Sequence, residues 1–415
     1  MTAIRTARGA GSAGAGPDQP GPDQPGPDQA GPADRGPAES GPPEGGRLAE
    51  LIRTRSVLVC CGTGGVGKTT TAAAAALEAA RAGRTACVVT IDPAKRLADA
   101  LGLAELSNRP HRIDGPWPGQ LWALMLDTKG TFDDLVDRYS PSAEQARSIL
   151  DNRLYRNISG ALSGTQEYMA MEKLYELHHG GVEGVPDFDL VVVDTPPTRH
   201  ALEFLDAPRR LTAFLDNRIF RLLMAPTRMY LKAVSAATQT FLKTLSRVVG
   251  REVVGDAIAF FEAFEGMEAG FRDRAQVVRD LLAAPETGFV VITSPRPDAV
   301  EEASFFARRL ADQHLRVAAL IVNRIQPRFG PVGAEKEDVA PPPPALSPAG
   351  PLDTLRANLR DLDRMAELDE SHFAGLAAQV APAVLVRVPY LASDVHDLDG
   401  LALIADHLAG APRRA

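Results

Sequence analysis

Cysteine is scarce in this chain of 415 residues, and no apolar run reaches the length needed to cross a membrane. The three cysteines, Cys60, Cys61 and Cys87, lie in short apolar segments. They have neither the spacing of a zinc site nor the pattern of a disulfide framework. The first residues do not form an apolar segment of the signal-peptide type. These absences favour a cytoplasmic protein with buried, reduced thiols.

An excess of positive charge is also missing, because the formal net charge is −8 at pH 7. This balance argues against a general affinity for nucleic acid. The charge is nevertheless uneven, since residues 207–251 carry nine lysines and arginines against one acidic residue, Asp216. Basic side chains on amphipathic helices most often form a solvated face. A surface for DNA or for an anionic membrane is the alternative.

A glycine-rich segment at residues 62–69 has the pattern of a phosphate-binding loop, Gly-Thr-Gly-Gly-Val-Gly-Lys-Thr. It follows an apolar run at 56–61 and precedes an alanine-rich stretch that ends at Arg81. The glycines allow successive N–H groups to face one anion, and the helix N-terminus adds a positive dipole. We expect Lys68 to bridge the β- and γ-phosphates of ATP and the Thr69 hydroxyl to bind Mg²⁺. The predicted nucleotide-binding residues here are Gly64, Gly65, Val66, Gly67, Lys68, Thr69 and Thr70.

The rest of the chain alternates short β-type runs with helical stretches. Strands are predicted over 56–61, 86–91, 121–126, 189–193, 288–293, 317–322 and 384–388. Continuous apolar strands between helices predict an α/β fold, a mostly parallel, doubly wound P-loop sheet with helices on both faces. Residues 128–180 and 209–283 read as helical throughout, and we expect them to form an inserted helical subdomain over the nucleotide edge of the sheet.

Two segments do not fit this pattern. Residues 1–46 repeat Gly-Pro-Asp-Gln-Pro with almost nothing apolar nearby, so we expect a disordered tail. A second proline-rich segment at 327–350 is expected to be a surface loop. The ATPase domain would then cover residues 47–410.

Polar side chains end three of the predicted strands, at Asp92, Asp194 and Asn323. Ligands of parallel sheets bind beyond the carboxyl ends of the strands, so these positions can converge with the loop. Asp92 would orient an attacking water, Asp194 would hold the Mg²⁺ shell, and Asn323 would pair with an adenine edge. Alone, each aspartate is more often a helix cap or a turn residue. The order of the three along the chain favours the functional reading.

Together these motifs resemble the arsenical pump-driving ATPases and the ATPase that targets tail-anchored membrane proteins, which are dimeric P-loop ATPases with a deviant Walker A motif. The resemblance covers about 51–326 and 384–408. The residues that support it are Gly62 to Thr71, Asp92-Pro93-Ala94, Asp194 to His200, Asn323 and Val388 to Leu391.

The resemblance implies a role for each matched position. Asp92 would be the water-activating residue of the first switch, and Asp194 would begin the second, where Thr198 would help to sense the γ-phosphate. Asn323 and Pro389 would hold adenine. The helical subdomain matches the region in which targeting members of the family form a groove for hydrophobic clients.

The chain departs from this family at the second position of the loop. Members usually have a lysine there that reaches the partner subunit's phosphates, whereas this chain has Thr63. Slow hydrolysis, a substitute cation (Lys95, Arg96 or Arg199) and a lysine-bearing paralogous partner are the three outcomes left open. Cysteines for arsenite and a Cys-x-x-Cys pair for a bridging zinc have no counterpart here, so neither arsenite transport nor a zinc clamp is expected.

Three functions follow from these observations. The first is a Mg²⁺-dependent ATPase whose homodimer or heterodimer opens and closes with the nucleotide and couples hydrolysis to a client or partner. The second is a nucleotide switch that hydrolyses ATP barely at all and holds a hydrophobic or membrane client. The third is a positioning ATPase that uses the basic segment. Apolar stripes on such helices are most often plain core. The side chains that exceed one stripe, and so suggest a client surface as the alternative, are Phe220, Leu222, Leu223, Met224, Met229, Tyr230 and Leu231.

Overall fold

The computed structural model describes residues 44–92, 96–158, 165–180, 184–215, 268–329 and 350–410. All of them belong to one compact unit that spans residues 42–415. Several expectations lie outside the described residues: the tail up to residue 43, residues 216–267 of the basic and apolar helical region, and residues 330–349 of the proline-rich segment.

The described residues contain an eight-stranded sheet with the order β3-β4-β2-β5-β1-β6-β7-β8. Every neighbouring pair is parallel except β3 and β4. The strands are β1 (Val57–Gly62), β2 (Thr85–Thr90), β3 (His111–Ile113), β4 (Gln120–Met125), β5 (Leu190–Asp194), β6 (Thr287–Thr293), β7 (Val317–Ile325) and β8 (Val384–Pro389). The expected mostly parallel α/β fold is confirmed, and β3 is the strand that the sequence pattern missed.

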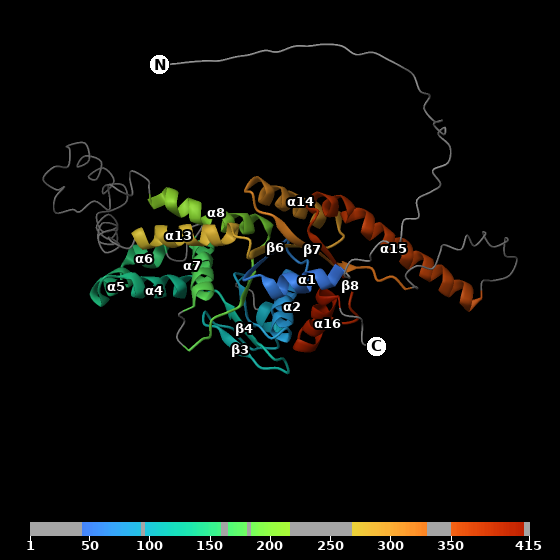
Figure 1. Cartoon of the computed structure of the whole chain (residues 1–415), viewed down its shortest axis with the longest axis horizontal. Helices are drawn as coiled ribbons and strands as arrows, with labels where there is room; N and C mark the ends of the chain where they lie inside the picture. Colours follow the sequence, from blue (N-terminus) through green and yellow to red (C-terminus); the bar gives the residue numbers. More distant parts are fainter. Residues whose placement is uncertain are drawn as a thin grey trace, which may run out of the picture. The chain divides into compact units, whose positions relative to one another are not determined.

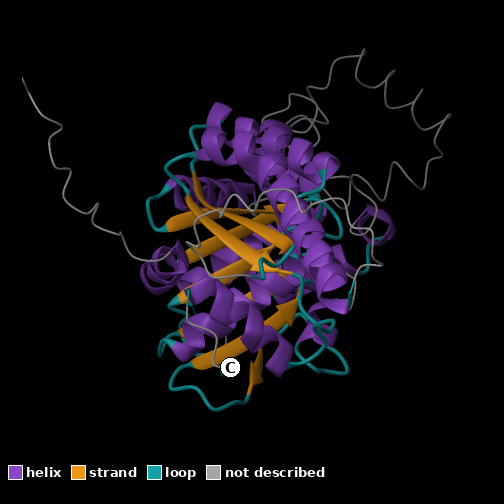
Figure 2. Cartoon of the chain, turned by 90° about the vertical axis from the view of Figure 1, so that its right-hand side faces the viewer, coloured by secondary structure: helices purple, strands orange, loops and turns teal. Residues whose placement is uncertain are grey.

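Helices cover both faces of the sheet, as Figure 2 shows. Successive side chains of a strand point to opposite faces, so Leu58 and Cys60 of β1 pack on one side and Val57 and Val59 on the other. The first face carries α1 (Glu44–Thr54), α2 (Lys68–Arg81), α3 (Arg96–Ala100) and α16 (Leu398–Ala409). The second face carries α7 (Thr165–His179), α8 (Thr198–Leu215), α13 (Glu268–Ala283), α14 (Pro297–Asp312) and α15 (Pro351–Val380).

Helix α2 lies directly behind the phosphate loop and is almost wholly buried. Alanine dominates its sequence, which suits a helix of this kind, because alanine loses no side-chain entropy and has the highest helix propensity. The small side chains also let α2 pack closely against α16, β2 and β5. The loop is therefore attached to one of the most tightly enclosed helices of the fold.

A third apolar cluster lies away from the sheet, among the helices between β4 and β5 and one helix that precedes β6. It joins α4 (Thr128–Tyr139), α5 (Ala143–Leu150) and α6 (Arg153–Ile158) to α7 and α13. Figure 1 shows these helices gathered in one part of the molecule. Within it the buried Arg274 on α13 makes an ion pair of 2.7 Å with Glu172 on α7. The Arg274 guanidinium also lies 3.8 Å from the centre of the Tyr139 ring. Helix α7 thus contacts both the sheet and this helical cluster.

Helix α15 is 30 residues long and carries charged side chains along its length. None of the helices that the structure describes is both long and apolar enough to span a bilayer.

Candidate nucleotide-binding site

The phosphate loop connects β1 to α2 in a conformation that requires glycine at two positions. Gly65 has a φ of 79° and Gly67 a φ of 87°, both in the left-handed region that side chains disfavour. A Cβ on Gly67 would lie 2.3 Å from Asn323 Nδ2, whereas a Cβ on Gly65 would meet nothing within 4 Å. The loop leads straight into the first residues of α2, Lys68 and Thr69, which are both buried. This arrangement places a lysine at the N-terminus of a helix, a position that favours negative charge.

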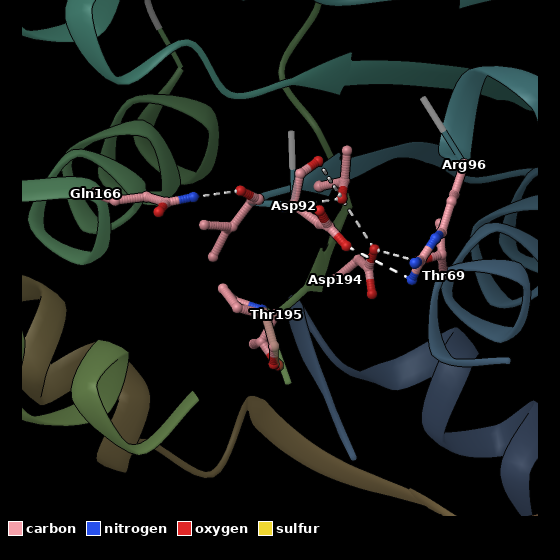
Figure 3. A network of polar contacts seen from close by, with 9 residues as sticks. Thr69, Asp92, Arg96, Gln166, Asp194 and Thr195 are labelled. Atoms are coloured by element: carbon pink, nitrogen blue, oxygen red, sulfur yellow. Dashed lines mark hydrogen bonds and ion pairs between the residues drawn. The ribbon is translucent and has the colours of Figure 1, made fainter. Parts of the chain in front are cut away.

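Asp194 is the centre of the polar network at the tips of β1, β2 and β5 (Figure 3). Its Oδ2 accepts hydrogen bonds from Thr69 Oγ1 at 2.7 Å and from Thr90 Oγ1 at 2.9 Å. The side chain is fully buried, with 0% exposure. Its other oxygen, Oδ1, is buried without a hydrogen-bond partner among the described residues. A buried carboxylate oxygen left in this state is a ready acceptor for a ligand or a cation.

Burial disfavours the charged form of Asp194. Burial raises the pKa of its carboxyl above the ordinary value, and nearby Lys68 and the two hydroxyl donors oppose part of that rise. Asp92 acts on the same pKa, so Lys68, Asp92 and Asp194 lie close enough to interact electrostatically.

The residues around Oδ1 fit a magnesium ion. The Thr69 hydroxyl has a single proton and donates it to Asp194, so its lone pairs remain for a cation. Carboxylate and hydroxyl oxygens are the ligand types that Mg²⁺ prefers. Thr69 and Asp194 are therefore the side chains that could hold the ion, directly or through water.

Asp92 follows β2 at the edge of this network. Its backbone N–H donates to Thr90 Oγ1 at 3.3 Å. Its carboxylate makes an ion pair of 3.7 Å with Arg96, whose side chain is 64% exposed against 24% for Asp92. The preceding carbonyl, Ile91 O, accepts a hydrogen bond of 2.7 Å from Gln166 Nε2 on α7 (Figure 3). The backbone next to Asp92 is thereby hydrogen-bonded to α7, the helix that also packs in the third apolar cluster.

The end of β7 contacts the outer side of the phosphate loop. Asn323 Nδ2 donates to Val66 O at 2.8 Å, and Arg324 Nη1 donates to Gly65 O at 2.9 Å. The Asn323 side-chain oxygen accepts from the backbone N–H of Arg324 at 2.9 Å. The Asn323 amide nitrogen is therefore hydrogen-bonded to the phosphate loop in this structure. The contact of Asn323 with adenine stays a prediction.

A cavity of about 460 Å³ adjoins the same side of the loop. This volume is in the range of small-ligand sites. Its walls are formed by Thr63 to Val66, by Arg296 and Asp298 near the start of α14, by Arg324 and Tyr390, and by Asp369 and His372 on α15. Pro389 ends β8 opposite Ile325 and immediately precedes Tyr390.

The structure thus places the loop, Asp92 and Asp194 together at one end of the sheet. Asn323, at the end of β7, contacts the loop through Val66 O. Thr70 continues α2 and is half-buried. Of the proposed substitute cations, Arg96 is paired with Asp92, Lys95 lies outside the described residues, and only the backbone of Arg199 is described. The same holds for Thr198.

Three residues that contact the site were not identified from the sequence: Thr90, Gln166 and Arg324. Thr90 stands two residues before Asp92 at a strand end, so its position was a usable signal. Gln166 and Arg324 make their contacts across 75 and 259 residues of the chain. No local pattern marks either of them.

A parallel α/β sheet with this loop and these strand-end carboxylates defines a P-loop nucleotide-binding protein. Residues 54–329, more than half of the chain, match the anion-transporting ATPase family. The chain belongs to that family.

Several ATPases are similar to this chain. It is 28% identical over 290 residues to ATPase GET3B of Arabidopsis thaliana, a match that covers 64% of this chain and 63% of that protein. It is 26% identical over 295 residues to ATPase ARSA1 of Chlamydomonas reinhardtii, covering 65% and 35% respectively. With ATPase get3 of Aspergillus terreus it is 28% identical over 148 residues, covering 35% and 41%. The chain thus spans less than two thirds of the length of each of these relatives.

Proposed function

We propose that this protein binds ATP and hydrolyses it to ADP and phosphate in a magnesium-dependent reaction. The observation that carries the proposal is the buried carboxylate of Asp194, held by Thr69 and Thr90 with one oxygen unpaired. Membership of the anion-transporting ATPase family and the ATPase names of the relatives support the same activity.

Each residue at the strand tips has a distinct part in this proposal. Lys68 and the loop N–H groups bind the phosphates, and Lys68 counters the charge that develops on the γ-phosphate. Asp92 accepts a hydrogen bond from the attacking water and orients it. Thr69 and Asp194 would hold magnesium, which would supply charge stabilisation for the phosphate oxygens. Asn323 and Pro389 would contact adenine.

The ion pair between Arg96 and Asp92 bears on the rate. At 3.7 Å and with Arg96 largely exposed, the pair is weak enough to open. In the paired state the Asp92 carboxylate is held by Arg96, and when the pair opens the attacking water would replace Arg96 as its contact. Thr63 adds no positive charge to the loop and is itself buried. Both features favour slow turnover, so a slow or non-hydrolysing switch is the second candidate function.

We also propose a dimer, formed with a second copy or with a paralogous ATPase, that changes state with the nucleotide and acts on a client or partner protein. The family membership supports this proposal. A hydrophobic or membrane client would bind the helical region, and the third candidate, a positioning role for the basic segment, falls mostly outside the described residues.

Phosphate release and ATP binding, measured together, test the activity. The wild-type protein should release phosphate steadily with Mg²⁺, and Asp92→Asn should bind ATP with nearly unchanged affinity while releasing phosphate at least tenfold more slowly. Lys68→Ala should lose binding as well. Asp99→Asn, on the exposed face of α3, is the matched control and should behave as wild type. If the wild-type protein binds ATP but releases phosphate no faster than Asp92→Asn, only the nucleotide-switch function remains. If it does not bind ATP, both the ATPase and the switch are refuted.

Sedimentation with and without ATP and Mg²⁺ tests the dimer separately. We expect Asp92→Asn with ATP to sediment as a dimer, alone or with a partner chain captured from lysate. A monomer under every condition, with no captured ATPase, would refute the dimer and leave the ATPase proposal standing.

A further inference from the structure

Arg324 has an unusual backbone conformation for a residue with a side chain. Its φ is 62°, and His314 is the only other non-glycine residue with positive φ in the described part of the chain. The pairing of β7 with β8 shifts register between Asn323 and Ile325, so Arg324 occupies a bulge. Such a conformation costs free energy and persists where surrounding contacts enforce it, often at functional sites.

The bulge turns Arg324 towards the phosphate loop. With its neighbour Asn323 it donates to two consecutive loop carbonyls, those of Gly65 and Val66. These contacts form a two-point support, which we call the β7 clamp.

The geometry of the peptide bond explains what the β7 clamp does. In a trans peptide the carbonyl of one residue and the N–H of the next point in opposite directions. When β7 holds Gly65 O and Val66 O on the outer side, it turns the N–H groups of Val66 and Gly67 to the inner side. Those N–H groups are the donors with which a phosphate loop binds its anion.

We infer that Arg324 is a positioning residue for the phosphate loop, an inference that rests on the proposed binding of ATP. Its left-handed backbone directs the guanidinium to Gly65 O, and the resulting bond holds the loop in its anion-binding form before the nucleotide arrives. The guanidinium also places a permanent positive charge at Gly65 O, and Arg324 lines the same cavity as the uncharged Thr63.

A glycine at position 324 separates this role from ordinary structural support. Arg324→Gly relieves the left-handed backbone and removes the bond to Gly65 O. We expect the melting temperature of the nucleotide-free protein to stay equal or rise, while the Kd for ATP and for inorganic tripolyphosphate rises about tenfold, the effect of one charge-assisted hydrogen bond. Arg324→Lys, which keeps a charged donor, should stay within about threefold of wild type. His314→Gly is the matched control, since it relieves the same backbone strain at the end of α14 and should leave both Kd values unchanged.

Three results would overturn the inference. The first is a wild-type Kd in Arg324→Gly, and the second is a fall in its melting temperature that parallels the loss of binding, because that pattern indicates only structural support. The third is a loss in Arg324→Lys as large as in Arg324→Gly. Failure of the wild-type protein to bind either ATP or tripolyphosphate would instead refute the proposed function, and this inference with it.

Discussion

Replacing Gly67 by alanine tests how tightly β7 and the phosphate loop are fitted together. The left-handed φ of 87° costs an L-residue about 1–2 kcal/mol. The new Cβ would lie 2.3 Å from Asn323 Nδ2, which is buried and bonded to Val66 O, so the amide must give up that bond. Leaving a buried polar group unpaired costs a further ~1–3 kcal/mol. We expect Gly67→Ala to lower the free energy of unfolding by about 2–5 kcal/mol in total.

Gly65→Ala is the matched control, because Gly65 has a φ of 79° and open space where its Cβ would be. It should cost only the backbone part, about 1–2 kcal/mol. The free energy of unfolding of both variants is measured by urea unfolding without nucleotide, followed by circular dichroism. The Gly67→Ala substitution is then measured again in an Asn323→Ala background. There the clash is gone, and the cost of Gly67→Ala should fall to that of Gly65→Ala. Equal costs for the two glycines in the wild-type background, or an undiminished cost without Asn323, would refute the reasoning.

Three further predictions follow from contacts around the site. Because burial raises the pKa of Asp194, the charged carboxylate costs stability as pH rises from its unfolded pKa of about 3.9 through the higher folded pKa. The stability of Asp194→Asn relative to wild type, from urea unfolding at several pH values, should therefore increase over that interval, and a pH-independent difference would contradict this. Gln166→Ala removes the bond to Ile91 O and should slow phosphate release about fivefold with ATP affinity retained, whereas Gln276→Ala on α13 should not; equal effects would count against the link. Burial raises the pKa of Cys61 to about 12, so at mildly alkaline pH its thiol should be alkylated only when the protein unfolds. Rapid alkylation of Cys61 in the folded protein would contradict its burial.

The sequence predicted the central strands because they are continuous apolar runs. β1 and β5 are buried at every position, and buried parallel strands have this pattern. The loop was predicted from its glycine motif and Asp194 from its place at the end of an apolar strand, and their convergence was expected because a parallel sheet places its strand ends together. β3 was missed because it has three residues, two of them exposed, and gains its place only by antiparallel pairing with β4.

The contacts of the β7 clamp could not be predicted in the same way. Asn323 was expected to face adenine, and its bond to Val66 O joins residues 257 positions apart. The left-handed backbone of Arg324 results from the register shift against β8 and from the loop carbonyl in front of it, neither of which leaves a mark in the local sequence. Strand ends can be located from patterns, whereas the bonds between them depend on the assembled sheet.

The magnesium dependence of ATP binding tests the role of Asp194 most directly. Calorimetric titration of the wild-type protein with ATP should give tighter binding with Mg²⁺ than with EDTA. In Asp194→Asn and Thr69→Val that difference should disappear, while binding of magnesium-free ATP persists. A wild-type affinity that is indifferent to Mg²⁺, or an Asp194→Asn protein that keeps the full magnesium effect, would contradict the account.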